Sequence, residues 1–329
     1  MIESIDNLKV QVLTANTTDV TLRSDPYFKS KVIQPGAAAV DCLAEHGLSF
    51  SLTTLRGKEI HNYLFDMGGR KATIINNLTA LKIAPSIFEK VFLSHGHYDH
   101  WGAIIEISKL LPDGTEFILN SIGLLPRYSL TKELTGVEID PSTMDFEKLK
   151  SEKKIRQLPE FPEKIFKELA KEKKFKLNFT DQPVEVESGV LTSGEITIFD
   201  FDEVTKGMLV QKGGRYIKDT FRDELSLYVG IKNKGLVVLT GCGHNGLINT
   251  IKHGIKLTGI SKIYAIIGGL HQNWASIERI RKTVRFIKEK FNPELICGLH
   301  CTGFKFIAEC MHQMPNQTVL GVVGTTFFL

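Results

Sequence analysis

A disulfide framework, membrane-spanning runs and a large excess of one charge are all missing from this sequence. Its five cysteines are odd in number and scattered through 329 residues, which does not fit a set of structural disulfides. No apolar run approaches the ~20 residues that span a bilayer. The acidic start, Met1–Asp6, has no hydrophobic region of the kind found in signal peptides. We therefore expect a reduced, cytoplasmic setting and no membrane partner.

The charge balance argues against a nucleic-acid partner. The formal net charge is only +4, and no stripe of Lys and Arg runs along the chain. A mild positive charge instead suits an anionic small molecule. Hydrophobic residues make up 42% and charged residues 24% of the chain, which is typical of a globular protein with a sizeable core. The length predicts one large domain or two.

One short stretch carries most of the chemical information. An apolar, strand-like run, Val91–Leu93, leads directly into a loop in which three histidines and one aspartate fall within six positions: His95, His97, Asp99 and His100. Imidazole nitrogens and carboxylate oxygens are the donors that zinc and similar ions prefer. A solvated loop would rarely collect these residues at this spacing, so the stretch predicts a metal site.

The same arrangement of strand, histidine and helix returns three times near the end of the chain. His244, His271 and His300 each follow an apolar, strand-like run, and each is followed by a segment with helical spacing. The strand-like runs are 236–239, 263–267 and 295–299, and the helices are expected at 247–257, 276–291 and 304–313, with 103–111 after the first motif. In α/β sheets ligands collect at the carboxyl ends of strands. We therefore expect the four loops to converge on one site.

The remaining segments define the expected architecture. Strands are predicted at 8–13, 47–55, 61–69, 184–186, 194–199 and 319–323, a helix at 71–81, and a hairpin turn at 211–215. Residues 120–176 are highly charged and helical in pattern, and four prolines divide them into short pieces. We expect this segment to be a helical cap inserted within a single domain over residues 1–329. Asp66 ends a strand, where it either forms a turn or holds a ligand histidine; its residue type alone favours the turn.

The motif His95-x-His97-x-Asp99-His100, with Asp66 upstream, resembles the metallo-β-lactamase superfamily over nearly the whole chain apart from the insert. That resemblance implies an α/β fold, an αββα sandwich with one or two metal ions at the sheet edges. The loops Thr240–Gly246, Gly268–His271 and His300–Gly303 are similar to a subgroup with an archaeal pterin-forming enzyme. That enzyme joins a dihydropterin pyrophosphate to a ribofuranosyl-aminobenzene phosphate, while other members are classed only as metal-dependent hydrolases.

The resemblance also implies roles for the motif residues. His95 and His97 would bind a first metal ion, and Asp99 and His100 would bind a second. His244 would complete the first site and His300 the second. The ions would be one or two divalent metals, zinc first, with iron or manganese as alternatives.

The roles of other residues near the expected site are less sharply defined by the sequence. His271 is a ligand, an acid/base group or a substrate contact. Asp66 would hold a ligand histidine in the correct tautomer, which replaces the turn interpretation. Most two-metal members of the superfamily have a Gly-Asp at the end of a strand, where the aspartate bridges the ions, but the comparable strand here ends in Gly241–His244 and has no aspartate. Either His244 takes that position or the bridge is missing. Cys242 and Cys301 are interpreted as buried neighbours of the ligands rather than as thiolate ligands.

These residues predict a metal-dependent enzyme acting on an anionic, phosphorylated small molecule by hydrolysis or displacement. The ions would lower the pKa of a bound water toward ~7 and polarise a phosphoryl or carbonyl oxygen, with Asp99 and His271 as catalytic groups. In a pterin-type condensation the ions would instead bind the pyrophosphate leaving group. The alternatives are a phosphodiesterase or nuclease of the same fold and a non-catalytic metal-binding sensor. The sequence leaves the oligomeric state open.

Overall fold

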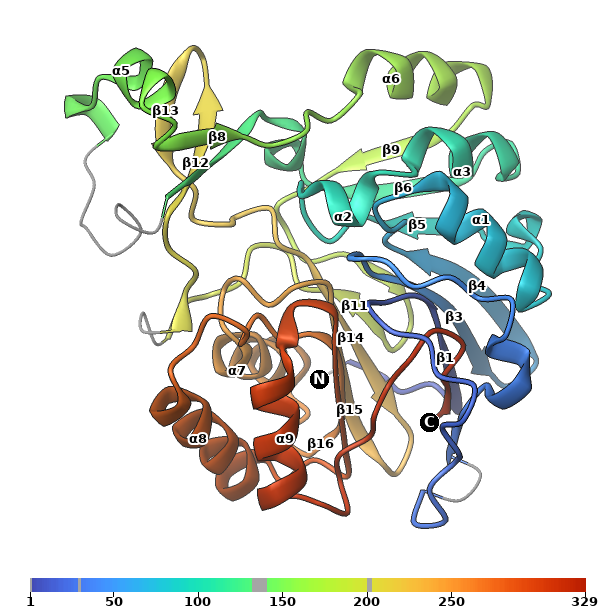
Figure 1. Cartoon of the computed structure of the whole chain (residues 1–329). Helices are drawn as coiled ribbons and strands as arrows, with labels where there is room; N and C mark the ends of the chain where they lie inside the picture. The colour runs from blue at the N-terminus through green and yellow to red at the C-terminus, as the bar shows by residue number, and fades with distance from the viewer. Residues whose placement is uncertain (1, 29–30, 132–140, 200–202) are drawn as a thin grey trace.

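A computed structural model describes residues 2–28, 31–131, 141–199 and 203–329. Two β-sheets pack face to face, and helices cover the outer face of each sheet (Figure 1). This is the αββα arrangement, so the predicted α/β fold class is confirmed. Within the described ranges, no helix combines the length and the apolar character that crossing a bilayer requires.

The first sheet is built mainly from the N-terminal half of the chain. In spatial order its strands are β2 (Val32–Ile33), β18 (Thr326–Phe328), β1 (Asn7–Thr14), β3 (Ser49–Arg56), β4 (Glu59–Phe65), β5 (Lys90–Phe92), β6 (Glu116–Leu119) and β9 (Lys176–Phe179). From β4 to β9 the neighbouring strands are parallel. Their outer face is covered by α1 (Lys71–Ala80), α3 (Ile104–Leu110) and α6 (Glu163–Glu172).

The second sheet comes from the C-terminal half. Its strands are, in order, β10 (Glu185–Glu187), β11 (Val190–Thr192), β14 (Ser226–Ile231), β15 (Gly235–Thr240), β16 (Ile263–Gly269) and β17 (Leu295–Leu299). The last three are parallel. They alternate with α7 (Leu247–Thr258), α8 (Ile277–Phe286) and α9 (Phe304–Gln313), which cover the outer face. The helix expected over 276–291 continues past α8 as a π-helical turn, Ile287–Phe291.

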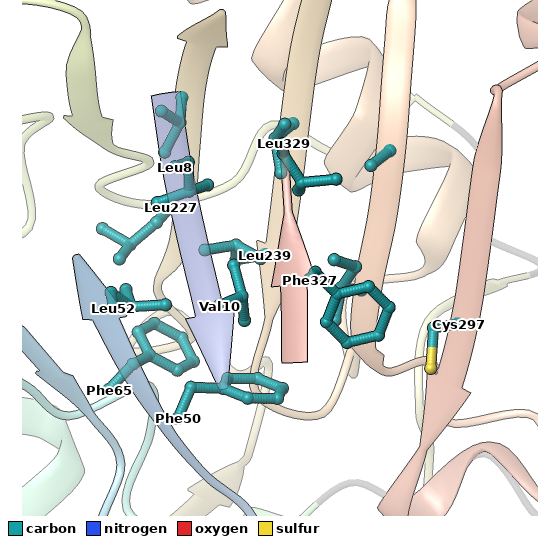
Figure 2. Packing of buried hydrophobic residues seen from close by; sticks show 14 of the residues in the cluster. Leu8, Val10, Phe50, Leu52, Phe65, Leu227, Leu239, Cys297, Phe327 and Leu329 are labelled. Atoms are coloured by element: carbon teal, nitrogen blue, oxygen red, sulfur yellow. The ribbon is translucent and has the colours of Figure 1, made fainter. Parts of the chain in front are cut away.

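The main core lies between the two sheets. Leu8 and Val10 of β1 and Phe50 of β3 meet Leu227 and Leu239 of the other sheet, and all five are fully buried (Figure 2). Full burial of such a side chain contributes about 1.5–3 kcal/mol, so this layer dominates stability. The parallel strands are apolar on both faces because their second face contacts helices, which explains their continuous apolar runs.

The segment predicted to be a helical cap, 120–176, contains strands as well as helices. Its helices are α5 (Phe146–Ser151) and α6, but β7 (Arg127–Leu130) and β8 (Ile155–Gln157) join β12 (Met208–Lys212) and β13 (Arg215–Lys218) in a four-stranded sheet. β9 also begins at the end of this segment. β12, which pairs with β7, lies about eighty residues further along the chain, beyond the range of a local pattern. Residues 132–140 of the predicted cap lie outside the described part of the chain.

Two predicted strands were wrong and one hairpin was confirmed. Residues 194–199 and 319–323 form no strand, although Val319 and Val323 are buried in the core. The C-terminal strand is β18, which pairs antiparallel with β1. The apolar residues at 319–323 therefore reflect burial in the core and not a β-strand. Gly213 and Gly214 form the predicted turn between β12 and β13, both with positive φ.

Helical and 3-10 turns complete the connections. They are α2 (Tyr98–Trp101) and the 3-10 turns Gly36–Ala39, Pro85–Ile87, Ser121–Leu124, Pro141–Thr143 and His300–Thr302. The first of these, α2, begins inside the histidine-rich motif. It places Asp99 and His100 on its first turn.

Candidate metal centre and active site

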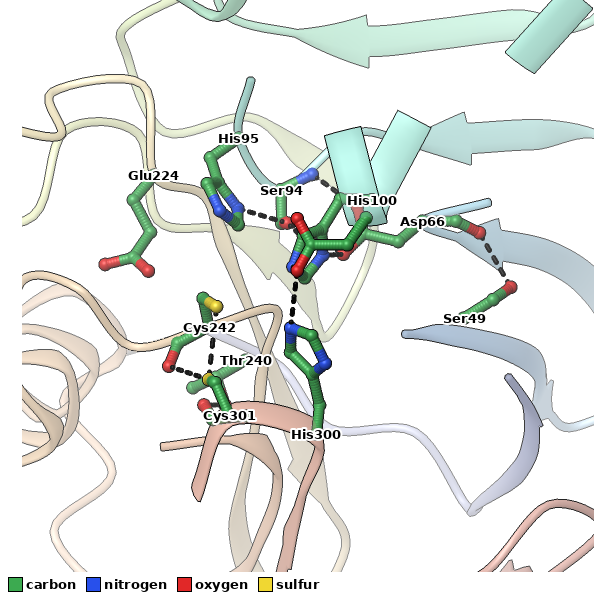
Figure 3. A network of polar contacts seen from close by, with 12 residues as sticks. Ser49, Asp66, Ser94, His95, His100, Glu224, Thr240, Cys242, His300 and Cys301 are labelled. Carbon is green, nitrogen blue, oxygen red and sulfur yellow. Dashed lines mark hydrogen bonds and ion pairs between the residues drawn. The ribbon is translucent and has the colours of Figure 1, made fainter. Parts of the chain in front are cut away.

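The carboxyl ends of β5, β15, β16 and β17 bring the predicted histidines to one place. The ring centres of His95 and His97 are 4.6 Å apart, those of His95 and His244 4.8 Å, and those of His244 and His271 4.2 Å. His100 and His300 are 5.0 Å apart. The strands belong to two different sheets, so the site lies at the edge where the sandwich opens (Figure 3). The predicted convergence of the four loops is therefore observed.

One cluster contains His95, His97 and His244. Their donor nitrogens lie within 4.8 Å of one another, and the Nε2 atoms of His95 and His244 are 3.2 Å apart. Burial, reinforced by the Arg127 charge, lowers the pKa of His97 to about 3, and burial also lowers the pKa of His95 and His244. These rings are therefore neutral at neutral pH. A neutral imidazole has a free nitrogen lone pair, which a metal ion requires.

A second cluster surrounds Asp99. Its Oδ2 atom lies 3.1 Å from His300 Nε2, 3.2 Å from His46 Nε2 and 3.9 Å from His100 Nε2. Burial opposes ionisation of Asp99, but the neighbouring His100 charge and hydrogen bonds from His300 and His46 hold its pKa well below the usual value. The structure thus brings Asp99, His100 and His300 together, as predicted. It adds His46, an isolated histidine before β3 that no sequence pattern distinguished.

Asp66 contacts His100 and Ser94 of the loop that follows β5, residues 94–100, which we call the motif loop. Its Oδ2 is 2.6 Å from His100 Nδ1, and its two carboxylate oxygens accept hydrogen bonds from the Ser94 backbone N–H and hydroxyl, each at 2.7 Å. The side chain is fully buried, and its backbone is left-handed with φ of 58°. Burial alone would lower the pKa of His100, but the Asp66 and Asp99 carboxylates raise it to about 9. Asp66 therefore orients His100 with Nε2 facing the cluster.

His271 lies beside His244 and belongs to one group of ligand spacing with His244 and Cys242. Its backbone is left-handed with φ of 46°, and its Nδ1 is buried and has no hydrogen-bond partner among the described residues. His300 is also left-handed, with φ of 51°, and its ring nitrogen Nδ1 lies 3.3 Å from Asn16 Oδ1. Left-handed backbone at Asp66, His271 and His300 carries strain, and such strain is concentrated at functional sites. A sequence pattern cannot reveal it, because these residues are not glycines.

A buried ion-pair network of Arg127, Asp219 and Asp223 holds the motif loop in place. Asp223 Oδ2 accepts a hydrogen bond from the Gly96 N–H at 2.8 Å and lies 2.7 Å from Arg127 Nη2. Arg127 Nε donates to Asp219 Oδ2 at 2.8 Å. Arg127 and both aspartates are buried. Asp223 is therefore not a surface residue, and Arg127 is not free to meet a phosphate.

Because residue 96 is glycine, the motif loop can lie in close contact with Arg127 and with the backbone of Gly123. A Cβ atom at this position would lie 2.0 Å from the carbonyl oxygen of Gly123, so the backbone contact requires glycine. The Trp101 indole donates to the Gly96 carbonyl at 3.0 Å, and its ring is buried against Phe161. Trp101 is a packing residue at the loop.

Replacing Arg127 with methionine is expected to lower the free energy of unfolding by about 3–5 kcal/mol, because it leaves Asp219 and Asp223 buried and unpaired. Urea unfolding measures this loss. The matched control is Arg222→Met, which breaks an exposed pair with Glu195 and should cost no more than about 1 kcal/mol. Equal losses in the two variants would contradict this account of the network.

The donor set fits a divalent metal ion. In the described part of the chain, the Nε2 atoms of His97 and His100 are buried without a hydrogen-bond partner, and leaving such atoms unpaired is costly. His100 Nε2 lies 3.9 Å from Asp99 Oδ2, and His97 and Asp99 line the same cavity. Five overlapping groups of His, Cys and Asp atoms among the described residues have ligand spacing. Imidazole nitrogens and a carboxylate are donors that zinc accepts.

The fold defines the class of structure, which is that of the metallo-β-lactamase superfamily. A metal-dependent hydrolase of the β-lactamase superfamily, Tm1679, has the same fold, with a TM-score of 0.70, 21% sequence identity, and coverage of 97% of this chain and 98% of that chain. No family model matches the sequence.

The family within that class follows from sequence similarity. The chain is 30% identical over 272 residues to the 7,8-dihydropterin-6-methyl-4-(β-D-ribofuranosyl)-aminobenzene-5'-phosphate synthase of Methanocaldococcus jannaschii, covering 80% of this chain and 82% of the synthase. It is also 26% identical over 294 residues to an uncharacterized protein of the same organism, covering 89% and 97%. The chain belongs to the family of this synthase, and it is an enzyme.

Proposed function

We propose that this enzyme uses one or two divalent ions, zinc first, to act on an anionic, phosphorylated small molecule. The observation that carries the proposal is the convergence of unpartnered, buried imidazole nitrogens with one carboxylate on the wall of a large cavity. His95, His97 and His244 would hold one ion. Asp99, His100 and His300 would hold the other.

The bound ions would supply Lewis acidity toward a phosphoryl or carbonyl oxygen and would acidify a water molecule. The protein's own side chains would orient the substrate and transfer protons. Asp99 lies at the cavity and is ionised, so one of its oxygens can orient or accept the proton of an attacking group. Burial lowers the pKa of His271, but Cys301 and Glu224 raise it overall, so this ring can donate a proton to a leaving oxygen.

The cavity supports a substrate with negative charge and a flat ring. Its volume is about 1900 Å³, and its wall includes His97, Asp99 and His271. It is also lined by four cations, Lys206, Lys252, Arg279 and Lys282. Trp274 and Phe304 line it as well, and they are 74% and 81% exposed, which is unusual for large aromatic side chains. Cations and exposed aromatic rings together suit a phosphorylated aromatic compound.

The most specific form of the proposal is a condensation like that named for the archaeal synthase. The family membership supports it, and so does a cavity with room for two small substrates. In that reaction a pyrophosphate would leave as the new bond forms, and no water would attack. Five free thiols fit a reducing compartment such as the cytoplasm.

The test is a panel of substrates offered to zinc-loaded and chelator-stripped enzyme. The panel contains lactones, phosphodiesters, pyrophosphates, and dihydropterin pyrophosphate with an aminobenzene ribofuranosyl phosphate. We expect turnover of a phosphorylated member, loss of turnover after chelation, and recovery on adding zinc. Turnover of phosphodiesters alone would favour the phosphodiesterase alternative. Tight metal binding without turnover of any compound would favour a sensor and refute the proposal.

A further inference from the structure

The two histidine clusters share no residue, yet one sulfur atom lies within 4.8 Å of donor atoms from both sides of the site. The donor atoms of His95, His97 and His244 form one group, and those of His46, Asp99 and His300 form another. Cys242 Sγ belongs to three further groups in the described part of the chain. Each keeps all its donor atoms within 4.8 Å of one another.

These three groups connect Cys242 to both sides of the site. One contains His95 and His100, another contains His244 and His271, and the third contains His300 and Cys301. Cys242 thus shares groups with His95 and His244 of the first cluster and with two residues near Asp99, His100 and His300. No other cysteine among the described residues appears in more than one group, which marks Cys242 as the central donor.

The local structure fixes this sulfur in place. Cys242 follows the last residues of β15 and is 3% exposed. A Cβ atom at Gly241 would lie 2.2 Å from the Ser94 hydroxyl oxygen, so β15 ends directly against the motif loop. Gly243 then adopts φ of 80° and turns the chain toward His244. Figure 3 draws Cys242 between His95 on one side and Cys301 on the other.

We propose that the Cys242 thiolate is a ligand shared by the two metal ions, an inference that rests on the proposed metal-dependent function. A thiol that binds an ion loses its proton to solvent, and the resulting anion offsets the positive charge of both ions. A thiolate is a soft donor that favours zinc over manganese and magnesium. The centre would therefore select zinc more strongly than a site of histidine and carboxylate alone.

Cys301 has a different position. Its sulfur belongs to a single group, and its thiol donates to the Cys242 carbonyl oxygen at 3.2 Å, with the two sulfur atoms 3.1 Å apart. Cys301 therefore positions Cys242 and is not the shared ligand. This difference gives the proposal a matched comparison between two neighbouring cysteines.

The test is a titration of metal-free protein with cobalt(II), followed by absorption in the near ultraviolet, where thiolate-to-cobalt charge transfer absorbs. If Cys242 is shared, the band grows with the first equivalent and again with the second. Cys242→Ser is expected to lose the band and to retain fewer equivalents of zinc after dialysis. Cys301→Ser should keep the band, as should the control Cys310→Ser, whose buried sulfur on α9 belongs to none of the groups.

Two results would overturn the shared ligand. One is a wild-type titration in which two equivalents of cobalt bind, as shown by their visible ligand-field bands, but the charge-transfer band does not form or grows with one equivalent only, a result that needs no variant to fold. The other is a band that survives in Cys242→Ser or is lost only in Cys301→Ser. Either result leaves the metal-dependent function standing, because that function is tested separately, by turnover of the substrate panel with and without metal.

Discussion

Replacing His97 with alanine is expected to lower kcat/KM by about 10³-fold and to reduce the bound metal, because His97 supplies a donor nitrogen that nothing else in the site replaces. A metal ion stabilises transition-state charge by several kcal/mol, and a loss of roughly 4 kcal/mol corresponds to about 10³-fold in rate. The His97 ring is neutral at neutral pH, since burial lowers its pKa to about 3. Its Nε2 atom is buried and has no hydrogen-bond partner among the described residues. Steady-state kinetics on whichever substrate the panel identifies gives the rate.

The matched control for His97→Ala is His312→Ala. His312 is exposed near the end of α9 and belongs to none of the groups with ligand spacing. It should keep wild-type activity and metal content. Wild-type kcat/KM in His97→Ala, with the fold intact by circular dichroism, would contradict the role assigned to the ring.

Replacing Asp66 with asparagine is expected to weaken metal binding at the Asp99 cluster by about 10- to 100-fold, the usual effect of removing a carboxylate behind a ligand histidine. Asp66 accepts hydrogen bonds from His100 and from both the N–H and the hydroxyl of Ser94. An amide must place an NH₂ group in one of these positions. If the NH₂ group faces the Ser94 N–H, two hydrogen-bond donors oppose each other and the hydrogen bond is lost. Facing His100, it makes Nδ1 an acceptor and moves the ring proton to Nε2, where a metal would bind.

Competition with a chromophoric zinc chelator measures this effect, and Asp113→Asn is the control. Asp113 is exposed and pairs only with Lys173 among the residues described, so its variant should bind zinc as the wild type does. Unchanged zinc affinity in Asp66→Asn would show that Asp66 acts only as a turn residue. That is the role its residue type alone favoured.

The parts of the site that follow a regular pattern were predictable. His95, His97, Asp99 and His100 are close in sequence, and their spacing carries the chemistry directly. His244, His271 and His300 were found because each follows an apolar strand, and parallel strands end at a common edge. The sandwich itself was predicted from the resemblance, while the repeated order of apolar strand and helix indicated α/β sheets.

The parts that depend on distant contacts were not predictable. His46 and Asn16 reach the site from loops with no strand-histidine-helix pattern, and they contact Asp99 and His300 only after folding. The pairing of Arg127 with Asp223 joins residues about a hundred positions apart. The same limit explains the predicted cap, whose strands are stabilised by partners at 208–218. Cys242 was interpreted as a neighbour of the ligands because its reach to both clusters exists only in three dimensions.

The central claim is that the strand-end histidines and Asp99 form a divalent metal centre, and metal analysis of the purified protein tests it most directly. Wild-type protein prepared with zinc in the medium should retain one or two zinc ions per chain after dialysis, and His97→Ala should retain fewer. No metal above the buffer background in the wild-type protein, or the same metal content in His97→Ala, would contradict the account.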